Sequence, residues 1–185
     1  MVKQETAVLG AYVLKPQVFG DYRGYFMETY SQRVFEELGL TSNFVQANES
    51  FTAKAGTLRG IHFQNNPMSQ CKVVRVTHGA VMDLVIDLRK GSPTYLKWQF
   101  LELTAKNKQM LYLPKGCGHG FLTLTDDVQF CYQVDALYSK EHDRSVRFDD
   151  PQLGIEWNVT NPILSEKDLK APFYQDSDCN FTYSA

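Results

Sequence analysis

Apolar and polar residues alternate along most of the chain in short runs typical of β-strands. Turn residues separate the clearest runs, which cover residues 44–50, 58–64, 72–77, 81–88, 98–103, 111–113, 121–124 and 128–134. Valine, isoleucine and aromatic residues are frequent in these runs, as in strands that pack one face against a core. Many short strands at regular spacing predict an all-β fold in which antiparallel strands form a barrel or jelly roll.

Two pairs of neighbouring runs have the spacing of β-hairpins. Runs 72–77 and 81–88 are joined by a turn that contains Gly79, and runs 121–124 and 128–134 flank a second short turn. Two strand patterns separated by a few turn residues commonly pair with each other. We therefore predict a hairpin at each turn.

The ends of the chain carry weaker patterns. Residues 7–14 predict a strand with a loop after it, and residues 31–38 have apolar positions at helical spacing and stop at Gly39, a residue that often ends helices. Near the C-terminus, Ser165 and Asp168 have the spacing of a helix capping box. We expect one short helix in the N-terminal half and short helical segments near the C-terminus.

Composition and charge narrow the class of protein. The chain has 185 residues, 43% hydrophobic and 22% charged, which suits a single domain spanning 1–185 with a sizeable core. Its net charge of -2 gives no electrostatic footprint for nucleic acid or an anionic membrane, and no apolar run approaches the roughly 18 residues of a spanning helix. An anionic ligand must therefore be met by locally placed cations.

Cysteine usage bears on the compartment. The four cysteines form no C-x-x-C pair, and the N-terminus lacks an apolar signal region. We expect a cytoplasmic protein with reduced thiols.

The richest chemistry lies in run 58–64 and in Lys72, eight residues further along. The run places His62 among apolar residues, and strict alternation along a strand would put Arg59 on the opposite face. Gly60 relaxes that parity if it marks a β-bulge. Taken alone, the run also fits a core histidine with its hydrogen bonds satisfied, beside two surface cations.

Motifs of several enzyme classes are missing from the sequence. There is no Gly-x-Ser-x-Gly elbow and no nucleotide-binding glycine fingerprint. His62 and His119 could ligate a metal in a barrel, but neither has a His-x-His partner or a carboxylate at a repeated offset. The remaining possibility is metal-free acid/base catalysis by histidine, tyrosine, aspartate and lysine. Histidine suits this chemistry because it titrates near neutral pH.

A series of motifs follows in one order along the chain: Asp21-x-Arg23-Gly24-x-Phe26-x-Glu28, Gln46-x-Asn48-x-Ser50, Leu58-Arg59-Gly60-Ile61-His62-Phe63-Gln64, Gln70-x-Lys72, Gly79-x-Val81-x-Asp83, Gly118-His119-Gly120-Phe121, Tyr132, Tyr138 and Leu164-Ser165-x-Lys167-Asp168. From about residue 20 to 172 the chain closely resembles the dTDP-4-dehydrorhamnose 3,5-epimerase family. The resemblance implies a cupin-type jelly-roll barrel, a homodimer, and a site without metal or cofactor.

The resemblance also implies an activity. Members of the family invert C3 and/or C5 of a dTDP-4-keto-6-deoxyhexose through an enolate, in deoxysugar biosynthesis of the dTDP-L-rhamnose kind. By resemblance His62 is the base, Asp168 holds its far nitrogen, and Tyr132 is the acid on the opposite face. Lys72 is implied near O4, where negative charge develops.

Binding residues are implied in the same way. Arg23, Arg59, Gln46 and Asn48 resemble the diphosphate contacts, since guanidinium forks and amides bind phosphate oxygens. The remaining implied substrate contacts are Glu28 at the nucleotide, His119 at the sugar, Tyr138 as an aromatic packed against the ligand, and Asp143 and Lys167.

Three positions depart from the family pattern. Cys117 and Gly118 replace the more usual Phe and Ala, and Asp143 stands where the family usually has Glu. A shorter acid and a smaller wall would enlarge or shift the sugar pocket. The sugar, the nucleotide and the choice of C3, C5 or both therefore stay open.

Other interpretations also remain open. Arg23 and Glu28 fit a solvated pair beside a hairpin, and Asp168 fits a helix cap alone. A sugar-nucleotide-binding module would need the fold and cations but no base and acid, so His62 and Tyr132 speak against it. A metal-dependent cupin oxygenase or isomerase is the third alternative.

Overall fold

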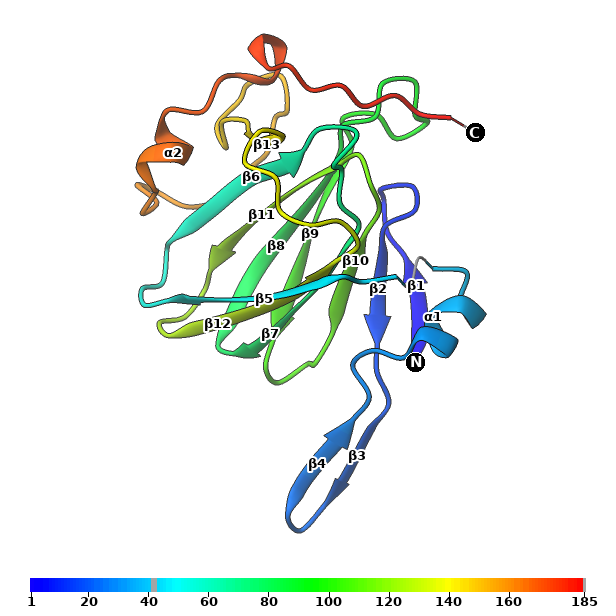
Figure 1. Cartoon of the computed structure of the whole chain (residues 1–185). Helices are drawn as coiled ribbons and strands as arrows, with labels where there is room; N and C mark the ends of the chain where they lie inside the picture. The colour runs from blue at the N-terminus through cyan, green and yellow to red at the C-terminus, as the bar shows by residue number, and fades with distance from the viewer. Residues whose placement is uncertain (41–42, 185) are drawn as a thin grey trace.

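Two antiparallel sheets packed face to face make up the computed structural model, which describes residues 1–40 and 43–184 (Figure 1). In spatial order the six-stranded sheet contains β1 (Val2–Glu5), β2 (Tyr12–Lys15), β10 (Met110–Leu113), β7 (Lys72–His78), β12 (Val128–Val134) and β5 (Gln46–Thr52). The five-stranded sheet contains β13 (Asp143–Ser145), β6 (Leu58–Gln64), β11 (Cys117–Thr123), β8 (Ala80–Asp87) and β9 (Trp98–Thr104). The predicted all-β jelly roll is confirmed.

Both predicted hairpins are wrong, because the strands on either side of each turn lie in different sheets. β7 pairs with β10 and β12, whereas β8 pairs with β9 and β11. Likewise β11 pairs with β6 and β8, whereas β12 pairs with β5 and β7. A short turn shows where the chain reverses, but not whether the next strand joins the same sheet or the facing one.

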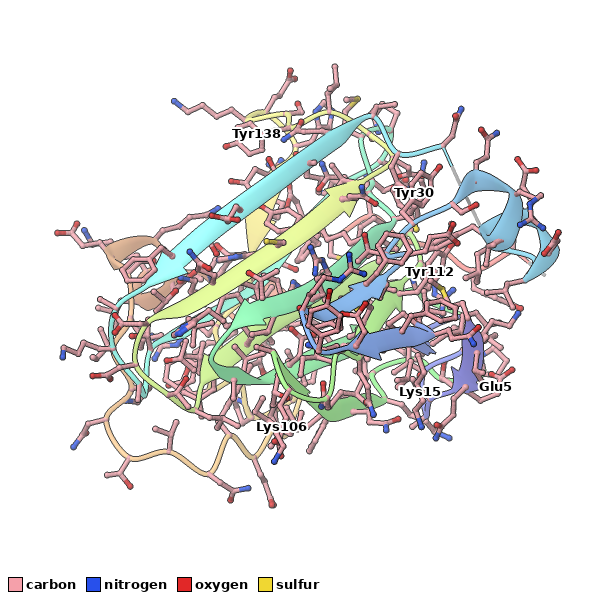
Figure 2. All side chains as sticks on the ribbon, turned by 90° about the horizontal axis from the view of Figure 1, so that it is seen from below. Glu5, Lys15, Tyr30, Lys106, Tyr112 and Tyr138 are labelled. Carbon is pink, nitrogen blue, oxygen red and sulfur yellow. The ribbon has the colours of Figure 1, made fainter. Side chains whose placement is uncertain are left out.

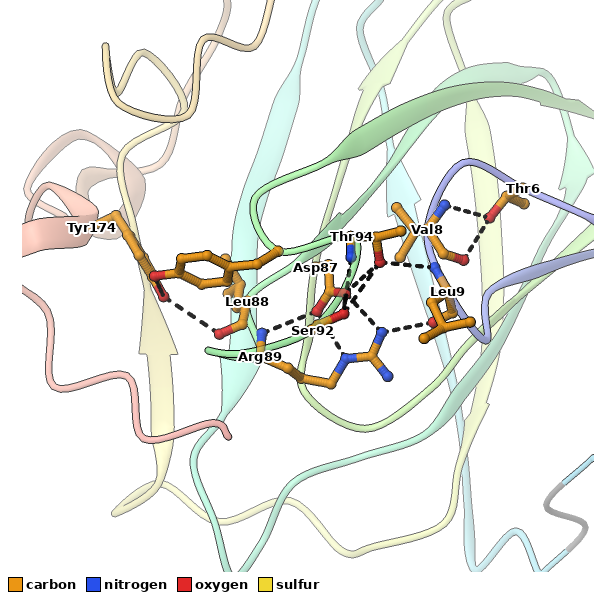
Figure 3. Close-up of polar contacts among 10 residues, drawn as sticks. Thr6, Val8, Leu9, Asp87, Leu88, Arg89, Ser92, Thr94 and Tyr174 are labelled. Carbon is orange, nitrogen blue, oxygen red and sulfur yellow. Dashed lines mark hydrogen bonds and ion pairs between the residues drawn. The ribbon is translucent and has the colours of Figure 1, made fainter. Parts of the chain in front are cut away.

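The loop between β8 and β9 is folded around the buried Asp87 carboxylate (Figure 3). The carboxylate accepts hydrogen bonds from Arg89 Nε at 2.8 Å, Ser92 Oγ at 2.5 Å and Thr94 Oγ1 at 2.6 Å. Burial favours the neutral acid, but these bonds outweigh it and hold the pKa of Asp87 below its ordinary value. Arg89 also donates to the Leu9 carbonyl, which ties the N-terminal segment to this loop.

Apolar side chains fill the space between the sheets and also cover the outer face of the five-stranded sheet. Between the sheets, Phe121 of β11 stacks on Phe130 of β12 with ring centroids 4.3 Å apart. On the outer face, Leu84 and Ile86 pack under the C-terminal segment that carries Trp157. The five-stranded sheet is thus buried on both faces, which gives the side chains that point into the barrel a rigid support.

The helices agree with the sequence. α1 (Gln32–Glu37) lies within the predicted helix and is followed by Gly39 with φ +69°. Phe35 of α1 is buried beside Tyr30, which Figure 2 shows close to Tyr112. The short α2 (Glu166–Leu169) and the 3-10 turn η1 (Tyr174–Asp176) confirm the expected C-terminal segments. None of the described helices is long and apolar enough to span a membrane.

The N-terminal region differs from the prediction. Only part of run 7–14 lies in a strand, because β2 begins at Tyr12 after a turn, and β1 pairs with it. The expected loop is a hairpin, β3 (Val18–Asp21) with β4 (Gly24–Met27), which projects away from both sheets (Figure 1). These strands are exposed along almost their whole length, so they lack the alternation from which a half-buried strand is predicted.

Candidate active site

A bulge in β6 sets the direction of the chemically rich run. His62 pairs with His119 of β11, and Arg59 pairs with Phe121, so β6 has one residue more than β11 between these pairs. The extra residue brings Arg59 to the same face as His62. Gly60 permits it, because its φ is +133° and a Cβ there would lie 2.6 Å from the Gly120 backbone. The relaxed parity expected at Gly60 is confirmed.

The two sheets contribute opposite walls of one site. His62 and His119 come from the five-stranded sheet, and Lys72 and Tyr132 come from the six-stranded sheet. Two adjoining cavities of about 150 and 130 Å³ share His62, Lys72 and Tyr132. The first is also lined by Ser50, Arg59, His119, Phe121 and Phe130, and the second by Gln46, Asn48, Phe63, Gln64, Gln70, Tyr138 and Asp143.

A carboxylate from α2 contacts the histidine on one wall. Asp168 Oδ1 lies 2.5 Å from His62 Nε2, and the carboxylate is 3% exposed whereas the imidazole is one-third exposed. Burial favours the neutral acid, but hydrogen bonds from His62 and Ser165 hold the pKa of Asp168 below its ordinary value. The contact leaves Nδ1 of His62 to take up a proton.

Asp168 takes part in the cap of α2 and also contacts His62, so the interpretation as a helix cap alone is wrong. Ser165 caps α2, because its hydroxyl oxygen accepts a hydrogen bond from the Asp168 backbone N–H at 3.1 Å. The same hydroxyl donates to Asp168 Oδ2 at 2.8 Å, while Oδ1 is engaged with His62. The cap therefore orients the carboxylate that holds the histidine.

The opposite wall carries a cation and a phenol in protonation states suited to catalysis. Burial lowers the pKa of Lys72 to about 8, although the carboxylates of Asp143 and Asp83 support its charged form. Burial raises the pKa of Tyr132, opposed by the positive charge of Arg59. At neutral pH Lys72 is an ammonium ion and Tyr132 carries its proton.

Asp83 is a site residue that our reasoning from the sequence did not single out. It is fully buried, and both of its carboxylate oxygens lie 3.1 Å from His119 Nε2. Burial raises its pKa, opposed by the nearby His119 and Lys72. A carboxylate inside the apolar run 81–88 is the signal that could have identified it, because buried acids are rare without partners.

Polar side chains from the edge strand β5 and neighbouring loops form the rim. Gln46 donates to Asn48 Oδ1 at 2.7 Å and accepts from the Tyr138 backbone N–H, so Tyr138 lies beside the end of β5 (Figure 2). Arg59 on β6 donates a hydrogen bond from Nε to the hydroxyl oxygen of Thr52, the last residue of β5. The amides and the guanidinium therefore lie along one rim of the paired cavities.

Three predicted substrate contacts lie outside the cavities. Arg23 is at the tip of the β3–β4 hairpin, where it pairs with Asp21, and Glu28 is exposed just beyond β4. The structure does not bring either residue to the cavity of its own chain. Lys167 lines neither cavity and instead pairs with Asp143 at 2.6 Å.

Two of the sequence departures do not line the paired cavities. A Cβ at Gly118 would meet Ile61 and Ile86, which belong to the cluster on the outer face of the five-stranded sheet. Cys117 is buried in the cluster between the sheets and lines neither cavity. The expectation of a smaller pocket wall at these positions is wrong, because their side-chain positions face packed apolar groups. Asp143 does lie at the rim.

This arrangement can remove and return protons on opposite sides of a bound molecule. A base with its carboxylate stands on one wall, a phenol stands on the other, and an ammonium adjoins both. Among residues 1–40 and 43–184, no three His, Cys, Asp or Glu side chains are grouped so that they could hold a metal ion.

Comparison with known proteins gives the family. The sequence profile described as dTDP-4-dehydrorhamnose 3,5-epimerase matches residues 5–176. A dTDP-4-dehydrorhamnose 3,5-epimerase of Shigella flexneri is 43% identical over 175 residues, which cover 94% of this chain and 96% of the relative.

Solved structures agree in both fold and sequence. A dTDP-4-dehydrorhamnose 3,5-epimerase of Bacillus anthracis, with TDP and PPi bound, is 48% identical with a TM-score of 0.89 and covers 91% of this chain and 97% of its own. A dTDP-6-deoxy-D-glucose-3,5-epimerase of Legionella pneumophila, in complex with dTDP-4-keto-L-rhamnose, is 36% identical with a TM-score of 0.93, covering 100% and 99%. Profile, sequence and structure thus match over nearly the whole length, and the chain belongs to the dTDP-4-dehydrorhamnose 3,5-epimerase family.

Proposed function

We propose that this protein epimerises a dTDP-4-keto-6-deoxyhexose at C3 and C5 by proton transfer through an enolate, without a metal or another cofactor. The observation that carries the proposal is the placement of His62 and Tyr132 on opposite walls with Lys72 adjoining both. An inversion needs a base and an acid on opposite faces of the carbon.

The reaction starts at His62. Nδ1 takes the proton from C5 or C3, which flank the C4 carbonyl, and the electron pair of the broken C–H bond forms an enolate with its charge on O4. Asp168 stabilises the imidazolium that results, and the Lys72 ammonium stabilises the charge on O4. Tyr132 then protonates the carbon from the opposite wall. A proton returned from solvent to the phenolate, and one lost from His62, restore the starting state.

The rim of the cavities suits the diphosphate of the nucleotide. Arg59 presents a guanidinium, and Gln46 and Asn48 present amides, so phosphate oxygens would meet donors of both kinds. The paired cavities are small, which fits a sugar within them and the nucleotide across the rim.

A chelator-treated sample tests the proposal. We expect the purified protein, after exhaustive dialysis against EDTA, to convert dTDP-4-keto-6-deoxy-D-glucose to a product with inverted C3 and C5, as judged by proton coupling constants in NMR. Activity that is lost on dialysis and returns with added divalent metal would instead support a metal-dependent cupin.

The activity should depend on pH through Lys72. Since the pKa of Lys72 is about 8, its ammonium is present below that pH and is lost above it, so kcat/KM should fall above pH 8. Tyr132 keeps its proton in this range, because its pKa is raised. Lys72→Arg should move this alkaline limb to higher pH, since a guanidinium stays charged to about pH 12 or beyond. An unchanged limb in Lys72→Arg would contradict the assignment.

We also propose that the protein is a homodimer in which the β3–β4 hairpin of one copy reaches the cavity of the other. Arg23 at the tip of this hairpin and Glu28 just beyond β4 resemble nucleotide contacts, and neither lines a cavity of its own chain. Figure 1 shows the hairpin projecting away from both sheets. The hairpin also exposes Phe19, Tyr25 and Phe26 by 55–69%, an unusual amount of aromatic surface for a free element.

Light scattering should give about twice the chain mass of 21.2 kDa at micromolar concentration.

Mixing two inactive variants tests whether each site is shared between the two copies. A heterodimer of Arg23→Ala and His62→Ala chains has one cavity with an intact His62 and an intact partner hairpin, so the mixture should regain activity that each variant alone lacks. A monomeric mass, or a mixture no more active than its parts, would contradict this arrangement.

We place the activity in the cytoplasm and assign it to one epimerase domain formed by residues 1–185. In support, all four cysteines are free and the family profile covers most of the chain. The net charge of -2 gives no support for a nucleic-acid or membrane partner, and the local cations Arg59 and Lys72 are the groups that suit an anionic nucleotide-sugar ligand.

A further inference from the structure

The helix that carries the dyad carboxylate has little support of its own. α2 is a single turn of four residues, too short to be stable in isolation. Asp168 is its one buried side chain, while Leu169, its one apolar residue, is 51% exposed. Apolar burial therefore does not hold α2, and Asp168 is positioned by the Ser165 cap together with the contacts of the charged side chains of α2.

Main-chain hydrogen bonds fix the chain on either side of α2. Before the helix, the Ile163 carbonyl accepts from the Leu58 N–H at 2.9 Å. After it, the Pro172 carbonyl accepts from the Arg147 N–H at 2.9 Å. Between these two anchors, α2 is tied to β6 and β13 by two side-chain contacts, Asp168 with His62 and Lys167 with Asp143.

The second contact ends on the strand next to the catalytic base. Lys167 Nζ lies 2.6 Å from Asp143 Oδ2. Asp143 begins β13, which pairs with β6 so that Asp143 lies opposite Gln64 and Ser145 lies opposite His62. Lys167 directly precedes Asp168 in the chain, so the Lys167–Asp143 pair fixes α2 against the same strand pair that holds His62.

The Asp143 carboxylate is already engaged by protein donors. Its Oδ2 also accepts a hydrogen bond from the Tyr138 hydroxyl at 3.3 Å, so one oxygen joins β13, α2 and the loop that carries Tyr138. Asp143 borders the second cavity, whereas Lys167 lines neither cavity.

We infer that Asp143 and Lys167 act as positioning residues: their ion pair docks α2 so that Asp168 stays on His62. This inference rests on the proposed function only for its effect on turnover. It adds a role in supporting the dyad to the direct substrate contact that the family resemblance implies for both side chains.

Two single variants and their combination test the inference. Lys167→Met and Asp143→Asn should each lower kcat by up to about 100-fold, beyond any change in KM, since displacing a catalytic group lowers the rate of the bound complex. Because both act through one ion pair, the double variant should be no worse than the more severe single variant. Asp143→Glu keeps the charge and should restore most of the rate.

A spectroscopic signature reports on the dyad without substrate. In the proton NMR spectrum, the short His62–Asp168 hydrogen bond should give a far-downfield imidazole N–H resonance, identified by its loss in Asp168→Asn. We expect it to broaden or vanish in Lys167→Met and Asp143→Asn. Lys170→Met is the matched control: it removes the C-cap lysine of α2, whose exposed side chain pairs with Glu166 at 3.1 Å, and should leave the resonance and kcat unchanged.

The outcomes separate this inference from the proposed function. If Lys167→Met retains both the resonance and wild-type kcat, or if either variant raises KM alone, the positioning role is wrong and direct contact with substrate is favoured. If the wild-type protein fails to turn over the 4-ketosugar, the proposed function fails, and the resonance still decides whether the ion pair docks α2.

Discussion

Replacing His62 by alanine is expected to abolish exchange of the substrate hydrogens at C3 and C5 with solvent. No enolate can form without a base, and His62 is the proposed base because it lines both cavities and has Asp168 on its Nε2, whereas His119 lines only the first cavity. A general base contributes about 10²–10⁴-fold, so epimerisation should fall by at least that much.

Deuterium uptake followed by NMR is the measurement. His78→Ala serves as a control, because His78 lies at the end of β7, bonded to the Asp127 carbonyl, and lines neither cavity. A His62→Ala protein that exchanges deuterium nearly as fast as the wild type would show that another group is the base.

Replacing Tyr132 by phenylalanine is expected to separate exchange from inversion. The change removes the acidic proton on the opposite wall and keeps the ring, which packs against the core between the sheets. The enolate should still form and be reprotonated by His62 on its original face, which gives exchange with retained configuration. Inversion should fall by about 10²–10⁴-fold while exchange falls less.

Comparing the rate of deuterium uptake with the rate of product formation checks this separation. Tyr95→Phe is a suitable control, because it removes a hydroxyl bonded to Tyr174 at 3.1 Å, away from both cavities. Equal rates of inversion in Tyr132→Phe and wild-type protein would refute the role of the phenol.

The positions of the barrel strands could be predicted from the sequence, but their arrangement could not. Alternation and runs of apolar residues identified the segments that became β5 to β12, because most of these strands place apolar side chains in a buried cluster. The turns at Gly79 and at residues 124–127 look like hairpin turns, yet each crosses between the sheets. Pairing between strands far apart in sequence decides that choice, and no local pattern records it.

Local features of the site could likewise be predicted from the sequence, whereas its long-range contacts could not. Gly60 indicated that Arg59 and His62 could share a face, and the structure has the bulge that brings them together. The contact between His62 and Asp168, 106 residues apart, came only from the family resemblance, because the local pattern around Asp168 indicates a helix cap. The hairpin that carries Arg23 has no buried face, so its position relative to the cavity was not predictable from periodicity.

Incubation of the wild-type protein with dTDP-4-keto-6-deoxy-D-glucose in deuterated water tests the central claim most directly. Proton abstraction at both carbons next to the carbonyl predicts a product with one deuterium at C3, one at C5 and both centres inverted, as read by NMR. Deuterium at one carbon alone would restrict the enzyme to that centre. A substrate recovered without deuterium at either carbon would contradict the assignment of His62, Tyr132 and Lys72 to enolate chemistry.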